Sequence, residues 1–282
     1  MLIVPRVDEE IVIFAIPDDG RERFGSDTTL HVSIGLDSVG DPDSDVAQLA
    51  PRDVSGLTTI DLASIAPAGD DQVVITTRLI QSDAALPPLA ARARVACRGV
   101  LGVDRLPPGQ QTTMGCVVDP SAALAARVND GTVAAAMDVI AGIAAVISGP
   151  SPVSVMLADD RHTVVGAGPS SELGTQTRAA LTTTGYGVGA DLQAATDAVD
   201  PSVGLVVLIT ASAGPTVRRP DGAALARLVL SGSAAATHHP GFCGAVWPPV
   251  PHGGDIVGYL ASTPRALDTL VSGLVGPVLA AR

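Results

Sequence analysis

The feature that most constrains this chain is an alternation of apolar strands and helices that begins near residue 112. Residues 112–118 and 205–210 (LVVLIT) are short apolar runs, typical of strands buried on both faces. Residues 121–147 and 189–199 carry the longer periodicity of helices. Strands that alternate with helices predict a mostly parallel sheet covered by helices on both faces, so residues 111–282 are expected to form a Rossmann-like α/β domain. Further strands are predicted at 153–158 and 256–261, and a terminal helix from Pro264 to Ala281.

Residues 1–110 have a different pattern, in which short β-rich segments are separated by clusters of Gly, Pro and Asp. In the last of these segments Arg92, Arg94 and Arg98 fall on one side of a strand, and small apolar residues fall on the other. This half is therefore predicted to be an antiparallel β-sandwich, joined to the second domain by a hinge at 107–110 (PPGQ). The predicted strands are residues 11–16, 29–36, 73–80 and 92–101.

Composition excludes several classes of function. The chain has 282 residues, a net charge of −12 and only 2% aromatic side chains, so neither a phosphate-binding surface nor a base-stacking platform for nucleic acid is expected. All of its basic residues are Arg, which removes the lysine of a P-loop. Three widely spaced cysteines indicate a reducing, cytoplasmic setting, and no membrane span is predicted because Asp138 interrupts the most apolar stretch.

The most specific motif is GCVVDPSAAL (115–124), in which a buried strand ends in Asp119 and is followed by Ser121 and a helix. Parallel sheets bind ligands beyond the carboxyl ends of their strands, so a site is expected here. Over residues 112–282 the sequence resembles a von Willebrand factor A domain, whose first strand ends in an Asp-x-Ser-x-Ser motif at a metal-ion-dependent adhesion site. GYGVGADL (185–192) is similar to that family's glycine-threonine loop, and LVVLITASAG (205–214) to its strand ending in Thr-Asp-Gly.

The resemblance implies a degenerate metal site. Asp119 and Ser121 match the motif, but the remaining ligand positions fall on Ala123, Val188 and Ala211. Mg²⁺ or Ca²⁺ requires about six oxygen ligands, and this set offers two side chains, so no cofactor is expected. A shift of the alignment by a residue would allow Thr182, Thr183, Thr184 or Asp191 to contribute, and a partial Mg²⁺ or Ca²⁺ site completed by a partner is the alternative.

Two other motifs suggest different chemistry. GYGVGA (185–190) satisfies the Gly-x-Gly-x-x-Ala fingerprint of dinucleotide binding, which would make the protein a nucleotide-using enzyme, although the preceding residues are poor strand formers. A cluster near the C-terminus has zinc-ligating residue types in no standard spacing, and we interpret it as a surface loop around Trp247. Its members are His238, His239, Cys243 and His252.

Signatures of a catalytic nucleophile are absent from the sequence, so we expect a protein that is not an enzyme. The hypothesis is a protein-interaction module or an assembly subunit of a larger complex, in which Arg218 and Arg219 meet carboxylates of a protein partner. The expected contact residues are Asp119, Ser121, Tyr186, Arg218, Arg219 and Trp247.

Overall fold

A computed structural model describes residues 7–18, 20–25, 27–35, 46–68, 72–77, 86–149, 151–165, 170–219, 223–231, 242–249 and 254–280. These residues form two compact units: one within 1–82 and 102–104, the other within 83–101 and 105–282. The chain thus passes from the first unit to the second at residue 83 and returns to the first for 102–104, and the expected hinge at 107–110 lies inside the second unit, where Pro108–Gln110 form a short 3₁₀ turn.

The first unit consists of antiparallel strands, as predicted. Its largest sheet has the order β1-β6-β7, and two further strand pairs, β2 with β5 and β3 with β4, complete it. Alternate residues of β1 are half-buried and exposed, which is the period of a strand that covers a core on one face. The strands are β1 (Ile11–Ala15), β2 (Thr29–Leu30), β3 (Ser33–Gly35), β4 (Val46–Gln48), β5 (Arg52–Asp53), β6 (Ile60–Pro67) and β7 (Val73–Thr77).

The second unit is built on a six-stranded sheet with the order β10-β9-β8-β11-β12-β13. The short strand β10 is antiparallel to β9, and the other neighbours are parallel. The mixed α/β class and the mostly parallel sheet are therefore confirmed. The strands are β8 (Met114–Val118), β9 (Ser154–Leu157), β10 (Val164–Val165), β11 (Leu205–Thr210), β12 (Ala224–Val229) and β13 (Gly244–Val246).

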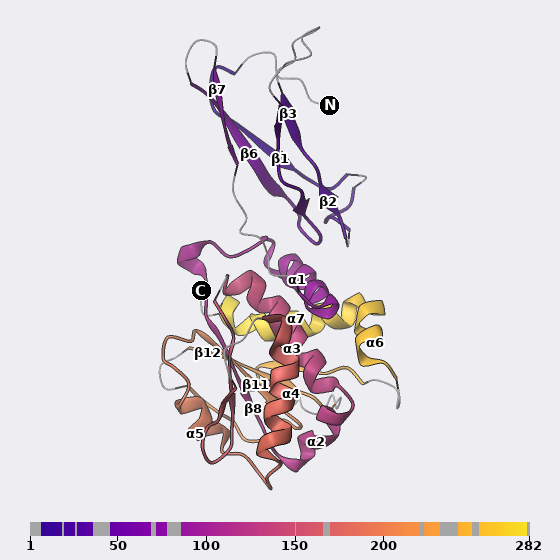
Figure 1. Cartoon of the computed structure of the whole chain (residues 1–282), viewed down its shortest axis with the longest axis vertical. Coiled ribbons are helices and arrows are strands. Elements are labelled where there is room, and N and C mark those ends of the chain that lie inside the picture. Colours follow the sequence, from indigo (N-terminus) through magenta and orange to yellow (C-terminus); the bar gives the residue numbers. More distant parts are fainter. Residues whose placement is uncertain are drawn as a thin grey trace. The chain divides into compact units, whose positions relative to one another are not determined.

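Helices flank this sheet (Figure 1). Helices α3 and α4 lie on one side of the sheet and α5 on the other. The side chains of α3 are almost entirely buried, which explains the high hydropathy of residues 132–147 without a membrane. The helices are α1 (Pro88–Leu101), α2 (Ala122–Asn129), α3 (Thr132–Ile147), α4 (Leu173–Thr184), α5 (Leu192–Asp197), α6 (Ile256–Ser262) and α7 (Pro264–Ala280).

Two predicted strands are wrong. Residues 92–101 belong to helix α1, whose buried residues Leu89, Ala93 and Cys97 recur every four positions and pack on α3. Residues 256–261 belong to helix α6, because Asp255 caps its N-terminus and accepts a hydrogen bond from the Val257 backbone N–H at 3.0 Å. The last strand of the sheet is β13 instead.

The single helix predicted over 121–147 is two helices. The axes of α2 and α3 meet at 81°, and Gly131 between them has a φ of +82°. Glycine reaches this left-handed conformation without the steric cost of a side chain. The Asp130 side chain then accepts a hydrogen bond from the Thr132 backbone N–H at 2.9 Å, so the second helix starts in a new direction.

Candidate functional site

The carboxyl ends of β8 and β11 form the topological switch point of the sheet. These two strands are neighbours, and the strand order runs away from them in both directions. Ligands of doubly wound sheets bind in the crevice outside such a point. Asp119 directly follows β8, and its backbone N–H donates a hydrogen bond to the Ile209 carbonyl at 2.9 Å. The motif found in the sequence therefore lies where a site is expected.

The Asp119 carboxylate is hydrogen-bonded within its own sequence motif. One carboxylate oxygen accepts a hydrogen bond from the Ser121 backbone N–H at 2.9 Å, and the other accepts one from the Ser121 hydroxyl at 2.9 Å. Ser121 is buried, with 8% of its surface exposed, and it serves as the N-cap residue of α2. The two residues thus form a hydrogen-bonded turn at the end of β8.

The glycine loop after α4 is bound to this turn by its backbone. Ser121 and Gly187 form a parallel β-bridge, in which the Ala122 N–H donates to the Gly187 carbonyl and the Gly187 N–H donates to the Pro120 carbonyl. The sequence could not show this contact, because 65 residues separate the two segments. Tyr186 is partly exposed and Val188 fully exposed, so the loop presents apolar side chains beside the Asp119 turn.

Three of the four side chains that a shifted alignment would supply make local hydrogen bonds in α4 and α5. The hydroxyls of Thr182 and Thr183 donate to carbonyls one turn earlier in α4. Asp191 caps α5 and accepts a hydrogen bond from the Ala194 N–H at 2.9 Å. In the part of the chain that the structure describes, no group of three or more His, Cys, Asp or Glu side chains could hold a metal ion. The Asp119 motif itself supplies two oxygen-bearing side chains, Asp119 and Ser121, whereas Mg²⁺ or Ca²⁺ takes about six oxygen ligands in all, waters included.

The glycine loop also lacks the context of a dinucleotide site. Residues 179–184 are the last part of helix α4, whereas the fingerprint requires a strand before its glycines.

Asp159, in the hairpin after β9, has a structural role. Its carboxylate accepts hydrogen bonds from the Thr163 hydroxyl and N–H, which lower the pKa of Asp159 despite the opposing effect of partial burial.

Two of the expected contact residues are not part of this site. Arg219 donates a hydrogen bond to the Val203 carbonyl at 3.0 Å, just before β11, whereas Asp119 contacts Ile209 near the end of that strand. Six residues of extended chain separate these two carbonyls by roughly 20 Å, so Arg219 lies near the amino-terminal end of β11, away from the carboxyl end where Asp119 lies. Trp247 is 2% exposed and its backbone N–H donates to the Val229 carbonyl, so it is a core residue and not a surface contact. A large aromatic ring gains more from burial beside the sheet than from exposure on a loop.

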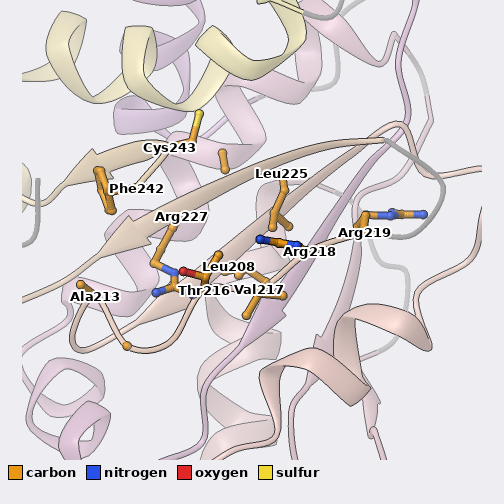
Figure 2. A pocket seen from close by; sticks show the side chains of 12 residues that line it. Leu208, Ala213, Thr216, Val217, Arg218, Arg219, Leu225, Arg227, Phe242 and Cys243 are labelled. Atoms are coloured by element: carbon orange, nitrogen blue, oxygen red, sulfur yellow. The ribbon is translucent and has the colours of Figure 1, made fainter. Parts of the chain in front are cut away.

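A cavity lies on the α5 side of the sheet, and Arg218 and Arg219, two of the contact residues expected from the sequence, line it (Figure 2). This cavity of about 390 Å³ lies over β11 and β12 and contains three arginines, Arg218, Arg219 and Arg227. Its signal in the sequence is one charged residue inside the apolar strand ALARLV (224–229). The remaining lining residues are Leu208, Ala213, Gly214, Thr216, Val217, Leu225, Ala226, Phe242 and Cys243.

The cysteines differ in exposure. Cys97 and Cys116 are buried, which raises the pKa of each thiol to about 12, and Cys243 is exposed. Its neighbours in the predicted zinc cluster, His238, His239 and His252, lie outside the described residues.

Comparison with models of known protein families, with curated proteins and with solved structures found no match. Across the described residues, no single helix is long and apolar enough to cross a bilayer. Only α2 and α3 taken together meet that requirement of length and composition, and they are the pair bent by 81°.

Proposed function

We propose that this chain is a protein-interaction or assembly module and not an enzyme. In this proposal the second unit is a von Willebrand factor A type domain that has lost metal binding, and the first unit is a β-sandwich. Side chains from β1, β3 and β7 pack on one buried cluster in the first unit, which supports the sandwich. A partner protein in the cytoplasm would contact the surface formed by Tyr186, Val188 and the Asp119 turn.

The family proposal is supported by the strand order together with the position of the motif. A 3-2-1-4-5-6 order, with the third strand antiparallel, places Asp119 and Ser121 after the first strand and at the switch point. The β-bridge from Ser121 to Gly187 brings in the glycine loop, which is the second landmark of the resemblance.

The observation that carries the functional proposal is the pairing of a satisfied carboxylate with exposed apolar side chains. Both oxygens of Asp119 accept hydrogen bonds from Ser121, so hydrogen bonds within the chain hold this turn. Val188 is fully exposed directly beside this turn, and a large exposed apolar side chain next to a rigid loop suits contact with a protein.

The test compares two exposed valines. The whole chain and its Val188→Asp and Tyr186→Ala variants serve as bait in lysate of the source cell, and captured proteins are quantified by mass spectrometry. Val164→Asp is the matched control, because Val164 is also exposed but lies on the edge strand β10. We expect one partner to fall more than tenfold with the two loop variants and to remain with the control. Equal capture by all of the variants would refute the proposed surface.

Two titrations address the alternatives. Calorimetry with Mg²⁺, Mn²⁺ and Ca²⁺ is expected to give no heat, and binding in the micromolar range that disappears in Asp119→Ala would instead establish a metal-dependent binder. A thermal-shift assay with NAD, NADP and ATP is expected to show no stabilisation, whereas a saturable shift would favour a nucleotide-using enzyme at 185–190.

A further inference from the structure

Arg227 is a buried cation, and no carboxylate pairs with it among the residues that the structure describes. It lies in the second strand from the edge, β12, and only 8% of its surface is exposed. Its guanidinium donates one hydrogen bond, from Nη2 to the Pro215 carbonyl at 2.6 Å, and within the described residues no acidic side chain pairs with it. A guanidinium has five N–H donors, so most of its hydrogen-bonding capacity is unused. Burial lowers the pKa of Arg227, consistent with an uncompensated charge.

The cavity in front of Arg227 arises from the way β11 connects to β12. Parallel neighbours are usually joined through a helix that covers the sheet, but the described residues 211–219 of this connection contain none. Val217 of this segment packs with Leu208 in the cluster that also holds α5. Because the described part of this connection has no helix, a cavity of about 390 Å³ lies above β12, and this volume is within the range of small-molecule sites.

The charge inside the cavity comes from two of its three arginines. Figure 2 shows Arg219 pointing away from Arg227, and Arg219 donates a hydrogen bond to the Val203 carbonyl. The pKa of the Asp200 carboxyl is lowered, mainly by hydrogen bonds from Ser202 and to a smaller extent by the charge of Arg219. Arg218 is held through its backbone, which exchanges two hydrogen bonds with the Gln193 side chain of α5. Its exposed side chain remains available at the cavity.

The rest of the lining is apolar. Leu208, Val217 and Leu225 form one wall, and no acidic side chain is among the described residues that line the cavity. In a chain of net charge −12, a cavity with a local excess of positive charge is unusual. Paired guanidinium groups bind carboxylate and phosphate oxygens in a bidentate way, and an apolar wall beside them suits the body of the same ligand.

We propose that this cavity binds a small organic anion, with its carboxylate or phosphate group on Arg227 and Arg218 and its apolar body against Leu208, Val217 and Leu225. The site is separate from the Asp119 turn, and the proposal does not depend on the proposed interaction surface.

The experiment titrates the full chain with benzoate and with phenyl phosphate, and uses benzamide as the neutral analogue. We expect at least one of the two anions to bind with a Kd below about 1 mM at low salt, and benzamide not to bind. The two anions separate a carboxylate ligand from a phosphate ligand. No binding of either anion, or equal binding of benzamide, would overturn the proposal.

Variants locate the binding. Arg227→Met is expected to weaken the anion more than tenfold and Arg218→Met about threefold to tenfold. Arg265→Met, which removes an exposed charge from α7, is the matched control and should leave the Kd unchanged. Because Arg227→Met removes a buried side chain, Leu225→Phe provides a second test that keeps every arginine and fills the cavity. If Arg218→Met and Leu225→Phe bind like the unmodified chain, the anion does not occupy this cavity and the proposal is wrong.

Discussion

Gly142, in the middle of α3, tests whether residues 88–101 form a helix that packs on α3 within the second unit. A Cβ built at Gly142 would lie 2.2 Å from the Ala90 carbonyl oxygen and 2.7 Å from the Ala93 Cβ. Ordinary contact begins at 3.4 Å, so α1 would have to move away by about 1 Å. The obstacle is largely backbone of α1, which cannot rotate out of the way as a long side chain can.

The magnitude follows from two opposing effects. Overpacking of a core contact costs about 1–3 kcal/mol, and a clash with backbone belongs at the upper end. Replacing Gly by Ala inside a helix stabilises the helix by about 1 kcal/mol, because Ala has the higher helix propensity. We therefore expect Gly142→Ala to lower the free energy of unfolding of the second unit by about 2 kcal/mol. A change of this size lowers Tm by roughly 4–8 °C for a unit of 150–250 residues.

The assay uses the single tryptophan. Trp247 is buried in the second unit, so its fluorescence during urea unfolding reports that unit. Gly109→Ala is the control, because a Cβ there meets nothing within 4 Å, and it should be neutral or slightly stabilising. If Gly142→Ala proves as stable as Gly109→Ala, the close crossing of α1 and α3 is refuted.

Three further predictions concern titratable groups. Burial raises the pKa of Asp138. Its charged form is thus disfavoured in the folded protein, and the penalty is absent at pH 3 and grows as pH rises through the unfolded and then the folded pKa. Asp138→Asn should therefore raise the urea midpoint at pH 7 but not at pH 3. The pKa of Asp159 is lowered in the folded protein, so its turn stabilises the fold at pH values above the unfolded pKa of about 4, and this stability is lost as pH falls through the folded pKa. Asp159→Ala should therefore lower the free energy of unfolding by about 1 kcal/mol at pH 7. The difference in free energy of unfolding between this variant and the unmodified chain should shrink at pH 2. With a thiol reagent at pH 8 the native protein should expose one reactive cysteine, Cys243, and denaturant should release Cys97 and Cys116; three thiols reacting without denaturant would contradict the buried positions.

The spacing of apolar residues predicted elements of the second unit correctly where it fitted either a strand or a helix but not both. The strand 205–210 has the predicted bounds, because five consecutive apolar residues followed by a β-branched threonine fit a strand buried on both faces. Residues 92–101 carried both periods: Arg92 and Arg94 alternate with small residues, while Ala93 and Cys97 recur every four. Packing against α3 decided between them, and that packing depends on a glycine 49 residues away from Ala93.

The candidate site was predictable only in part. The position of Asp119 and Ser121 at the end of a buried strand follows from local sequence alone. Trp247 was placed on the surface because the residues around it are rich in proline, but β13 carries it into the core. The sequence predicted Arg218 and Arg219 as contacts for carboxylates, but not the cavity or Arg227, because the connection and the strand that carry Arg218 and Arg227 come together only in the folded chain.

The sequence by itself determined the class of the second unit and the place of the Asp119 turn, since both follow from the period of apolar residues and from the last residue of one strand. Tertiary structure alone decided which segments meet: the glycine loop beside Ser121, α1 on α3, and a charged guanidinium inside the sheet. The physical reason is that hydrophobic burial depends on the area removed from water and not on distance along the chain, so a local pattern fixes an element but leaves its partners open.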